Sequence, residues 1–217
     1  MEKFARWSGV VYAALPKVHR VKLGQVHQLL AACFGHASYA SFRDADLRVL
    51  NQGACYVCFD EGAGVRRANS LGIPITQAQW REAWMALKPS GVSGHTWLIE
   101  AREMELAARL TFENADHPQI QAIKRSIGMG DGHWASSARC LDEIDALPEL
   151  LRFEVLGDVQ AFGNNVLLSV PVTAECVFKR IGRGMYAAGE LVNVVQRGAP
   201  REYEPEFEGE LYGMSED

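Results

Sequence analysis

The chain changes from helix-like periodicity to strand-like alternation near Pro148, and this change constrains its fold more than any other feature. All five tryptophans precede this point, whereas the sequence after Leu151 is rich in Val and Phe and alternates apolar with polar residues. Strands are predicted there near 152–161, 166–179, 185–196 and 202–212. Strands that follow one another through short turns pair antiparallel. The sequence therefore predicts an α+β fold, with a helical N-terminal region and small sheet followed by a C-terminal antiparallel β-sheet.

Length and composition fit two folded parts. At 217 residues, with 48% apolar and 23% charged residues, the chain can bury one large core or two small ones and lies close to the globular average. We expect residues 1–150 to form a mainly helical domain and residues 151–217 to form an antiparallel β domain.

Helix signals dominate the first of these domains. Thr76 and Gln79 form a capping box ahead of a face that carries Trp80 and Trp84. Helices are predicted over 4–15, 23–34, 38–46, 65–70, 77–87, 97–112 and 118–127, and strands within 47–59. The glycine-rich stretch 128–132 lacks the lysine of a phosphate-binding loop, and we expect it to be an ordinary loop.

The stretch 23–46 is predicted to be two short helices around one glycine. Gly35 interrupts the first apolar run, and Ser38 is well placed to cap the second helix, which carries Phe42 and Arg43. A pair of this kind resembles a helix-turn-helix unit, which would make the protein a DNA-binding regulator. Ser41 departs from that pattern, because helix-turn-helix units carry an apolar residue near this position.

Residues 23–43 also resemble a short helical motif of uncharacterised bacterial proteins, some of them encoded on mobile genetic elements. The run from Val26 to Tyr39 is similar, in addition, to a helical segment appended to certain glyoxalase-superfamily proteins. His36 stands where those segments usually carry an aromatic residue. The resemblance implies no catalytic role for any residue of this chain.

Positive charge is concentrated near the N-terminus. Residues 1–50 contain seven Lys or Arg and three acidic residues, a balance of +4, so the remaining 167 residues carry −9 of the total of −5. We expect Lys17, Arg20, Lys22 and Arg43 to contact a macromolecular partner, either a protein or a nucleic acid. The alternative interpretation is an ordinary solvated linker.

A second resemblance concerns Asp60 and Glu61. They follow the apolar run 56–59 and precede a short predicted helix, which is similar to a strand–acid–helix unit of PIN-type nucleases. That resemblance implies a metal-dependent nuclease in which these two carboxylates contribute to a Mg²⁺ or Mn²⁺ site. It is the enzymatic alternative for this chain.

Cysteine and histidine patterns do not indicate a metal site or a cofactor. The five cysteines are dispersed, and Cys55 and Cys58 lie three apart on a predicted strand, so their thiols should face opposite sides of it. We expect buried, reduced cysteines, and we expect His27 to be an interior histidine because no carboxylate lies within one helical turn of it.

The last predicted strand alternates five glutamates with largely apolar residues. Glutamate occupies every second position from Glu202 to Glu210. An extended strand would present these carboxylates on one face. We interpret this as a charged edge strand protected from aggregation, with an acidic ridge for a basic partner as the alternative.

Together these features favour a cytoplasmic, non-enzymatic bacterial accessory or adaptor protein. No apolar run reaches the roughly 20 residues that span a bilayer, and no common catalytic motif is present. We expect a macromolecular partner, no cofactor and no membrane, and homo-oligomerisation is an open alternative.

Overall fold

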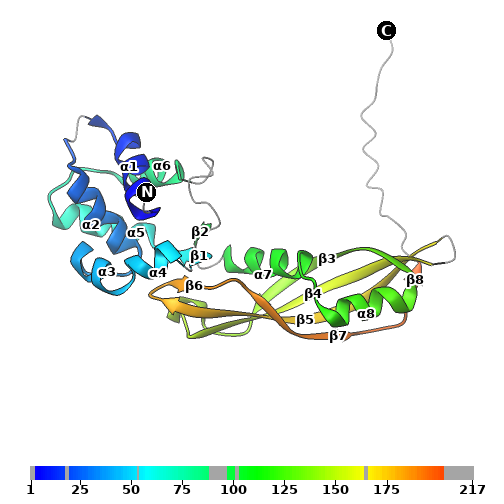
Figure 1. The fold of residues 1–217 in the computed structure, drawn as a ribbon. Coiled ribbons are helices and arrows are strands. Elements are labelled where there is room, and N and C mark those ends of the chain that lie inside the picture. The colour runs from blue at the N-terminus through cyan, green and yellow to red at the C-terminus, as the bar shows by residue number, and fades with distance from the viewer. Residues whose placement is uncertain are drawn as a thin grey trace, which may run out of the picture.

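The predicted α+β fold is confirmed. The computed structural model describes residues 3–17, 20–52, 54–87, 97–100, 103–163 and 166–202. A helical region lies at one end of the molecule, and a curled antiparallel sheet with two helices along it forms the other end (Figure 1). Within the described ranges no helix is long and apolar enough to cross a membrane.

Eight α-helices and eight strands make up the described part of the chain. The helices are α1 Lys3–Ala14, α2 Leu23–Cys33, α3 Tyr39–Ala45, α4 Leu47–Gln52, α5 Glu61–Ser70, α6 Gln77–Met85, α7 Met104–Glu113 and α8 Pro118–Ile127. The strands are β1 Tyr56–Cys58, β2 Trp97–Ile99, β3 Met129–Cys140, β4 Leu150–Gly163, β5 Val166–Gly182, β6 Met185–Tyr186, β7 Glu190–Gln196 and β8 Arg201–Glu202.

Several predicted helices form as their sequence signals indicate. The Ser38 hydroxyl accepts a hydrogen bond from the Ser41 backbone N–H and so caps α3. Thr76 and Gln79 make both hydrogen bonds of the capping box that begins α6. At α8, Pro118 occupies the first turn, where the missing N–H of proline costs nothing.

Three predictions were wrong. Residues 97–112 do not form one helix, because 97–99 pair as a parallel strand with β1 and the helix begins only at Met104. Residues 47–52 form helix α4, where Leu50 is fully buried in the helical core. The stretch 128–132 is not a loop, since all but Gly128 belong to β3, whose pairing with β4 is interrupted by a bulge between Gly130 and Gly132.

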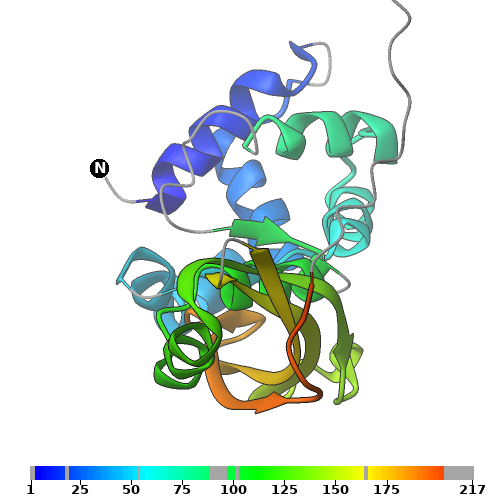
Figure 2. The same ribbon diagram turned by 90° about the vertical axis from the view of Figure 1, so that its right-hand side faces the viewer.

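The strands pair in the order β2-β1-β6-β5-β4-β3, with β7 and β8 also on β5. Except for the parallel pair β1–β2, these pairings are antiparallel. β4 and β5 form the central hairpin, from Leu150 opposite Lys179 to Gly163 opposite Val166. Seen along its strands, the sheet curls around its inner face (Figure 2).

Alternation in β4 decides which face of the sheet is inside. Leu151, Phe153, Val155, Val159 and Ala161 are fully buried, whereas intervening side chains are exposed or half-buried. These residues pack with α7 and α8, which cover the inner face, so the predicted amphipathic strand is confirmed.

The described residues have two hydrophobic cores that meet at β6. The first is formed by the helical region and includes Trp7, Trp80 and Met185. The second lies between the sheet and helices α7 and α8, and it includes Tyr186. Elements α7, α8 and β3 precede residue 150 but share the core of the C-terminal sheet.

The acidic alternation falls almost entirely outside the described residues. Arg201 and Glu202 form β8, opposite Ser169 and Leu168 of β5. The predicted strand 202–212 is therefore described only at Glu202, and its alternating glutamates from residue 204 onward remain a prediction.

Candidate functional site

Three of the four predicted partner-binding cations lie together on the turn between α1 and α2. Buried Leu15 and Val21 hold this turn against the helical core, so Lys17, Arg20 and Lys22 project outward and are exposed. No ion pair reaches their side chains from the part of the chain that the structure describes. We call these three residues the cationic corner.

Two large apolar side chains accompany the cationic corner. Tyr12 near the end of α1 is 46% exposed, and Leu23 at the start of α2 is 44% exposed. In both views the turn between these helices lies at an outer corner of the helical region, away from the sheet (Figures 1 and 2). The corner thus combines unpaired positive charge with apolar surface.

Arg43 does not join the cationic corner. It lies on α3, which Figures 1 and 2 place well away from the turn between α1 and α2. Its Nε donates to Asp44 Oδ1 at 2.9 Å, so its charge is locally compensated. Helix α3 has only seven residues, about two helical turns, and Phe42 is its one buried residue.

Asp60 and Glu61 lie at the start of α5, Asp60 as its N-cap and Glu61 as its first residue. Asp60 accepts hydrogen bonds from the Ala63 backbone N–H at 2.9 Å and from Arg66 at 3.0 Å, which makes it the helix cap. Glu61 is 8% exposed and accepts from Arg81 at 2.8 Å, from Gln77 at 3.0 Å and from Trp84 Nε1 at 3.1 Å. Both carboxylates therefore have structural partners.

The environment of Glu61 stabilises its ionised form. Burial by itself would raise the pKa of this carboxyl, but the hydrogen bonds from Arg81, Gln77 and Trp84 outweigh it and lower the pKa. Among the residues that the structure describes, no group of three His, Cys, Asp or Glu side chains comes close enough to hold a metal ion.

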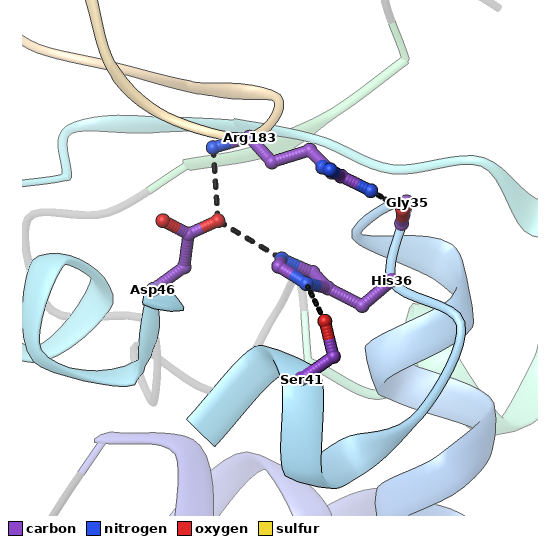
Figure 3. A network of polar contacts seen from close by, with 5 residues as sticks. All are labelled: Gly35, His36, Ser41, Asp46 and Arg183. Carbon is purple, nitrogen blue, oxygen red and sulfur yellow. Dashed lines mark hydrogen bonds and ion pairs between the residues drawn. The ribbon is translucent and has the colours of Figure 1, made fainter. Parts of the chain in front are cut away.

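A buried polar network joins the helical region to the turn between β5 and β6. His36 is 4% exposed, and its Nε2 lies 2.9 Å from Asp46 Oδ2 (Figure 3). The Arg183 backbone N–H donates to the same carboxylate oxygen at 2.9 Å, and Arg183 Nη1 donates to the Gly35 carbonyl at 2.7 Å. We call these contacts the His36–Asp46–Arg183 network.

Ser41 extends the network without building a hydrolytic centre. Its Oγ lies 3.4 Å from His36 Nδ1, which is near the limit for a hydrogen bond. Burial lowers the pKa of His36, although the Asp46 carboxylate partly opposes this shift. Neutral imidazole, with its Nε2–H donated to Asp46, is the form that this site favours, and it ties two distant segments together.

A cavity of about 350 Å³ lies next to this network, where the helical region meets the β5–β6 turn. We call it the seam cavity. It is lined by Cys33, Phe34, Gly35, Cys58, Phe59, Asp60, Asp145, Leu147, Arg183 and Gly184. Gly35 and Arg183 belong both to its lining and to the network beside it.

The cavity thiols are not nucleophiles. Burial raises the pKa of Cys58 to about 12 and that of Cys33 still further. Both are therefore protonated at neutral pH and contribute apolar surface. All five cysteines are free, and Cys55 and Cys58 are not bonded to each other. His27 is half-buried, and its ring packs beside the stacked rings of Phe4 and Tyr39.

Of the charged residues of the network and the cavity rim, only Asp60 was predicted as a site residue, and Asp46, Asp145 and Arg183 were not. Asp46 and Arg183 are 137 positions apart, so no local motif connects them. Two glycines flank Arg183 and are typical of a turn, but only the three-dimensional arrangement shows that Arg183 reaches Gly35.

Comparison with protein-family models, with curated proteins and with solved structures gave no match. The resemblance of residues 23–43 to a bacterial helical motif, and that of Asp60 and Glu61 to PIN-type nucleases, therefore remain predictions.

Proposed function

We propose that this chain is a non-enzymatic accessory protein of the cytoplasm that binds an acidic macromolecular partner through the cationic corner. The observation that supports this proposal is the exposure of Lys17, Arg20 and Lys22 without compensating carboxylates among the described residues. Unpaired positive charge on a protruding turn attracts and orients an acidic surface.

An acidic protein surface fits the corner better than a nucleic acid does. Specific DNA-binding proteins commonly contact about 6–10 phosphates, whereas the fourth predicted cation, Arg43, is separate and paired with Asp44. Exposed Tyr12 and Leu23 offer the aromatic and aliphatic contacts that anchor protein–protein interfaces. The partner is therefore an acidic protein segment with apolar residues.

Binding of labelled poly-L-glutamate to the full chain, followed by fluorescence anisotropy, tests this proposal. We expect the double variant Arg20→Glu/Lys22→Glu to bind on the order of tenfold more weakly, and the difference to shrink at high salt. The matched control, Arg125→Glu/Lys179→Glu, reverses two cations that lie on α8 and β5.

The outcomes separate the alternatives. Equal loss of affinity in both double variants would show that only net charge matters and would contradict a specific corner. Tighter binding of a short DNA duplex than of poly-L-glutamate, lost in the same corner variant, would replace the acidic protein by a nucleic acid.

A further inference from the structure

The seam cavity has an apolar floor and a charged rim. Its lining includes Phe34, Phe59, Cys33 and Cys58, which are all buried, and Leu147, which is half-buried. Asp60, Asp145 and Arg183 are exposed and supply the charges of the rim. Its volume of about 350 Å³ is within the range of small-molecule sites, about 300–1,000 Å³.

Arg183 is held in place before any ligand arrives. Its backbone N–H is bound to Asp46, and its Nη1 is bound to the Gly35 carbonyl. Its side-chain stem packs over Gly35, where a Cβ atom would come within 3.1 Å of the Arg183 Cδ. The guanidinium has five N–H donors, and one is used in these contacts. The others can bind a carboxylate in a fixed orientation.

Asp145 is the uncompensated negative group at the rim. No hydrogen bond or ion pair from the described residues reaches its carboxylate. Asp60 differs, because Arg66 and the Ala63 backbone N–H already satisfy it. The rim therefore offers one available cation, Arg183, and one available anion, Asp145.

We infer that the seam cavity binds a free α-amino acid with an apolar side chain. The ligand carboxylate pairs with the Arg183 guanidinium, the ammonium group pairs with Asp145, and the side chain enters the cavity beside Leu147, a half-buried apolar residue of its lining. A zwitterion matches one positive and one negative group without leaving either ligand charge uncompensated. This inference does not depend on the proposed function, since the cationic corner is not part of the cavity.

Isothermal titration calorimetry on the full chain tests the ligand class. The probes are L-phenylalanine and L-leucine, with 3-phenylpropionate lacking the ammonium group, 2-phenylethylamine lacking the carboxylate, and L-glutamate lacking an apolar side chain. We expect saturable binding of at least one of the two apolar amino acids. The two probes that lack one charged group should bind at least about tenfold more weakly, since a charge-assisted hydrogen bond contributes about 1.5–3 kcal/mol. L-glutamate should also bind at least about tenfold more weakly, since full burial of a Leu or Phe side chain contributes about 1.5–3 kcal/mol.

Two variants test the assignment of the rim. Arg183→Gln should weaken binding of the amino acid at least about tenfold, and Asp145→Asn should do the same without removing any described contact. Lys179→Gln and Glu143→Gln are the controls, because both lie outside the cavity lining and should bind as the unmodified chain does. Thermal unfolding of each variant without ligand separates lost binding from lost folding.

Absence of saturable binding by either apolar amino acid would overturn the inference. So would an unchanged affinity in Asp145→Asn, or 3-phenylpropionate binding as tightly as L-phenylalanine. Loss of binding in both rim variants, with normal unfolding of Asp145→Asn, would support it.

Discussion

At Gly64 the helical core leaves no room for a side chain. It lies on α5, and a Cβ atom there would come within 2.4 Å of Trp80 Nε1 and 2.6 Å of Cys33 Sγ. Neither neighbour can yield easily, because both are almost fully buried. The glycine therefore permits α5 to approach α2 and α6 closely, and so fixes the segment that carries Asp60 beside the seam cavity.

Gly64→Ala should lower the free energy of unfolding by about 1–3 kcal/mol, because the added methyl group overpacks the core. Gly9→Ala is the matched control, since Gly9 lies inside α1 with open space around it and its replacement should stabilise the helix by about 0.5–1 kcal/mol. Urea unfolding measures both changes. An unchanged free energy of unfolding in Gly64→Ala would show that α5 is not closely packed against its neighbours.

Glu61 should make stability depend on acidic pH. Its pKa is lower in the folded chain than in the unfolded chain, so its ion pair stabilises the fold above the ordinary glutamate range and is lost as pH falls through the folded pKa. Glu61→Gln should destabilise the chain by about 1–3 kcal/mol at neutral pH. The difference in free energy of unfolding between the unmodified chain and Glu61→Gln should become smaller below about pH 4.5, the ordinary value of the glutamate pKa.

Denaturant unfolding at neutral and acidic pH checks this prediction, with exposed Glu190 changed to Gln as the control. If the difference in free energy of unfolding between Glu61→Gln and the unmodified chain is the same at all pH values, the ionised Glu61 carboxylate does not stabilise the fold.

At the level of elements, polar contacts connect the helical region to the β5–β6 turn beside Gly35. The His36–Asp46–Arg183 network joins α2, α3 and the β5–β6 turn through hydrogen bonds of 2.7–2.9 Å. Gly35 has a φ of +79°, a conformation that glycine adopts without strain, and its carbonyl is thereby directed at Arg183. Asp46 is central because its Oδ2 accepts hydrogen bonds from both His36 and the Arg183 backbone N–H.

Asp46→Asn should loosen the β5–β6 turn more than the rest of the sheet. The amide keeps a single carbonyl acceptor and loses the charge that both donors use, at a cost of about 1–3 kcal/mol. Hydrogen exchange should accelerate at Arg183 and stay slow in the middle of β4. Asp44→Asn, which affects only an exposed pair, is the control. Equal acceleration in both variants would contradict this role of the network.

The sequence predicted helices and strands best where a periodic pattern of apolar residues extends over many positions. Alternation in β4 and the helical spacing of α1 and α8 are local patterns, and the structure confirms them. The three-residue strand β2 carries no period of its own, and pairing with β1 decides its conformation. In the same way β3 contains two glycines, and its pairing with β4 outweighs their weak strand propensity.

Side chains of α7 and α8 bond backbone groups of β3 and β7. On β3, the Ala135 N–H donates to Glu113 and its carbonyl accepts from Arg109, both on α7. On β7, the Val194 N–H donates to Gln119 of α8. Helix side chains thus satisfy backbone groups that would otherwise invite another strand.

At the scale of the whole molecule, a charged corner and a seam cavity lie on different parts of one α+β chain. The cationic corner was predictable because Lys17, Arg20 and Lys22 are close in sequence and Pro16 ends the helix before them. The rim of the cavity was not, because Asp145 and Arg183 come from separate segments that only the fold brings together. Sequence therefore indicates surfaces made by one segment better than sites made by several.

The most direct measurement of the proposed function is a two-dimensional ¹H–¹⁵N NMR titration of the full chain with poly-L-glutamate. We expect the largest shift changes between Tyr12 and Leu23, around the cationic corner, and unchanged signals in β4 and on α3. We expect the same titration of Arg20→Glu/Lys22→Glu to show these changes strongly reduced. Shift changes concentrated on α3 or on the outer face of the sheet, and retained in the double variant, would contradict the proposal that the cationic corner binds the partner.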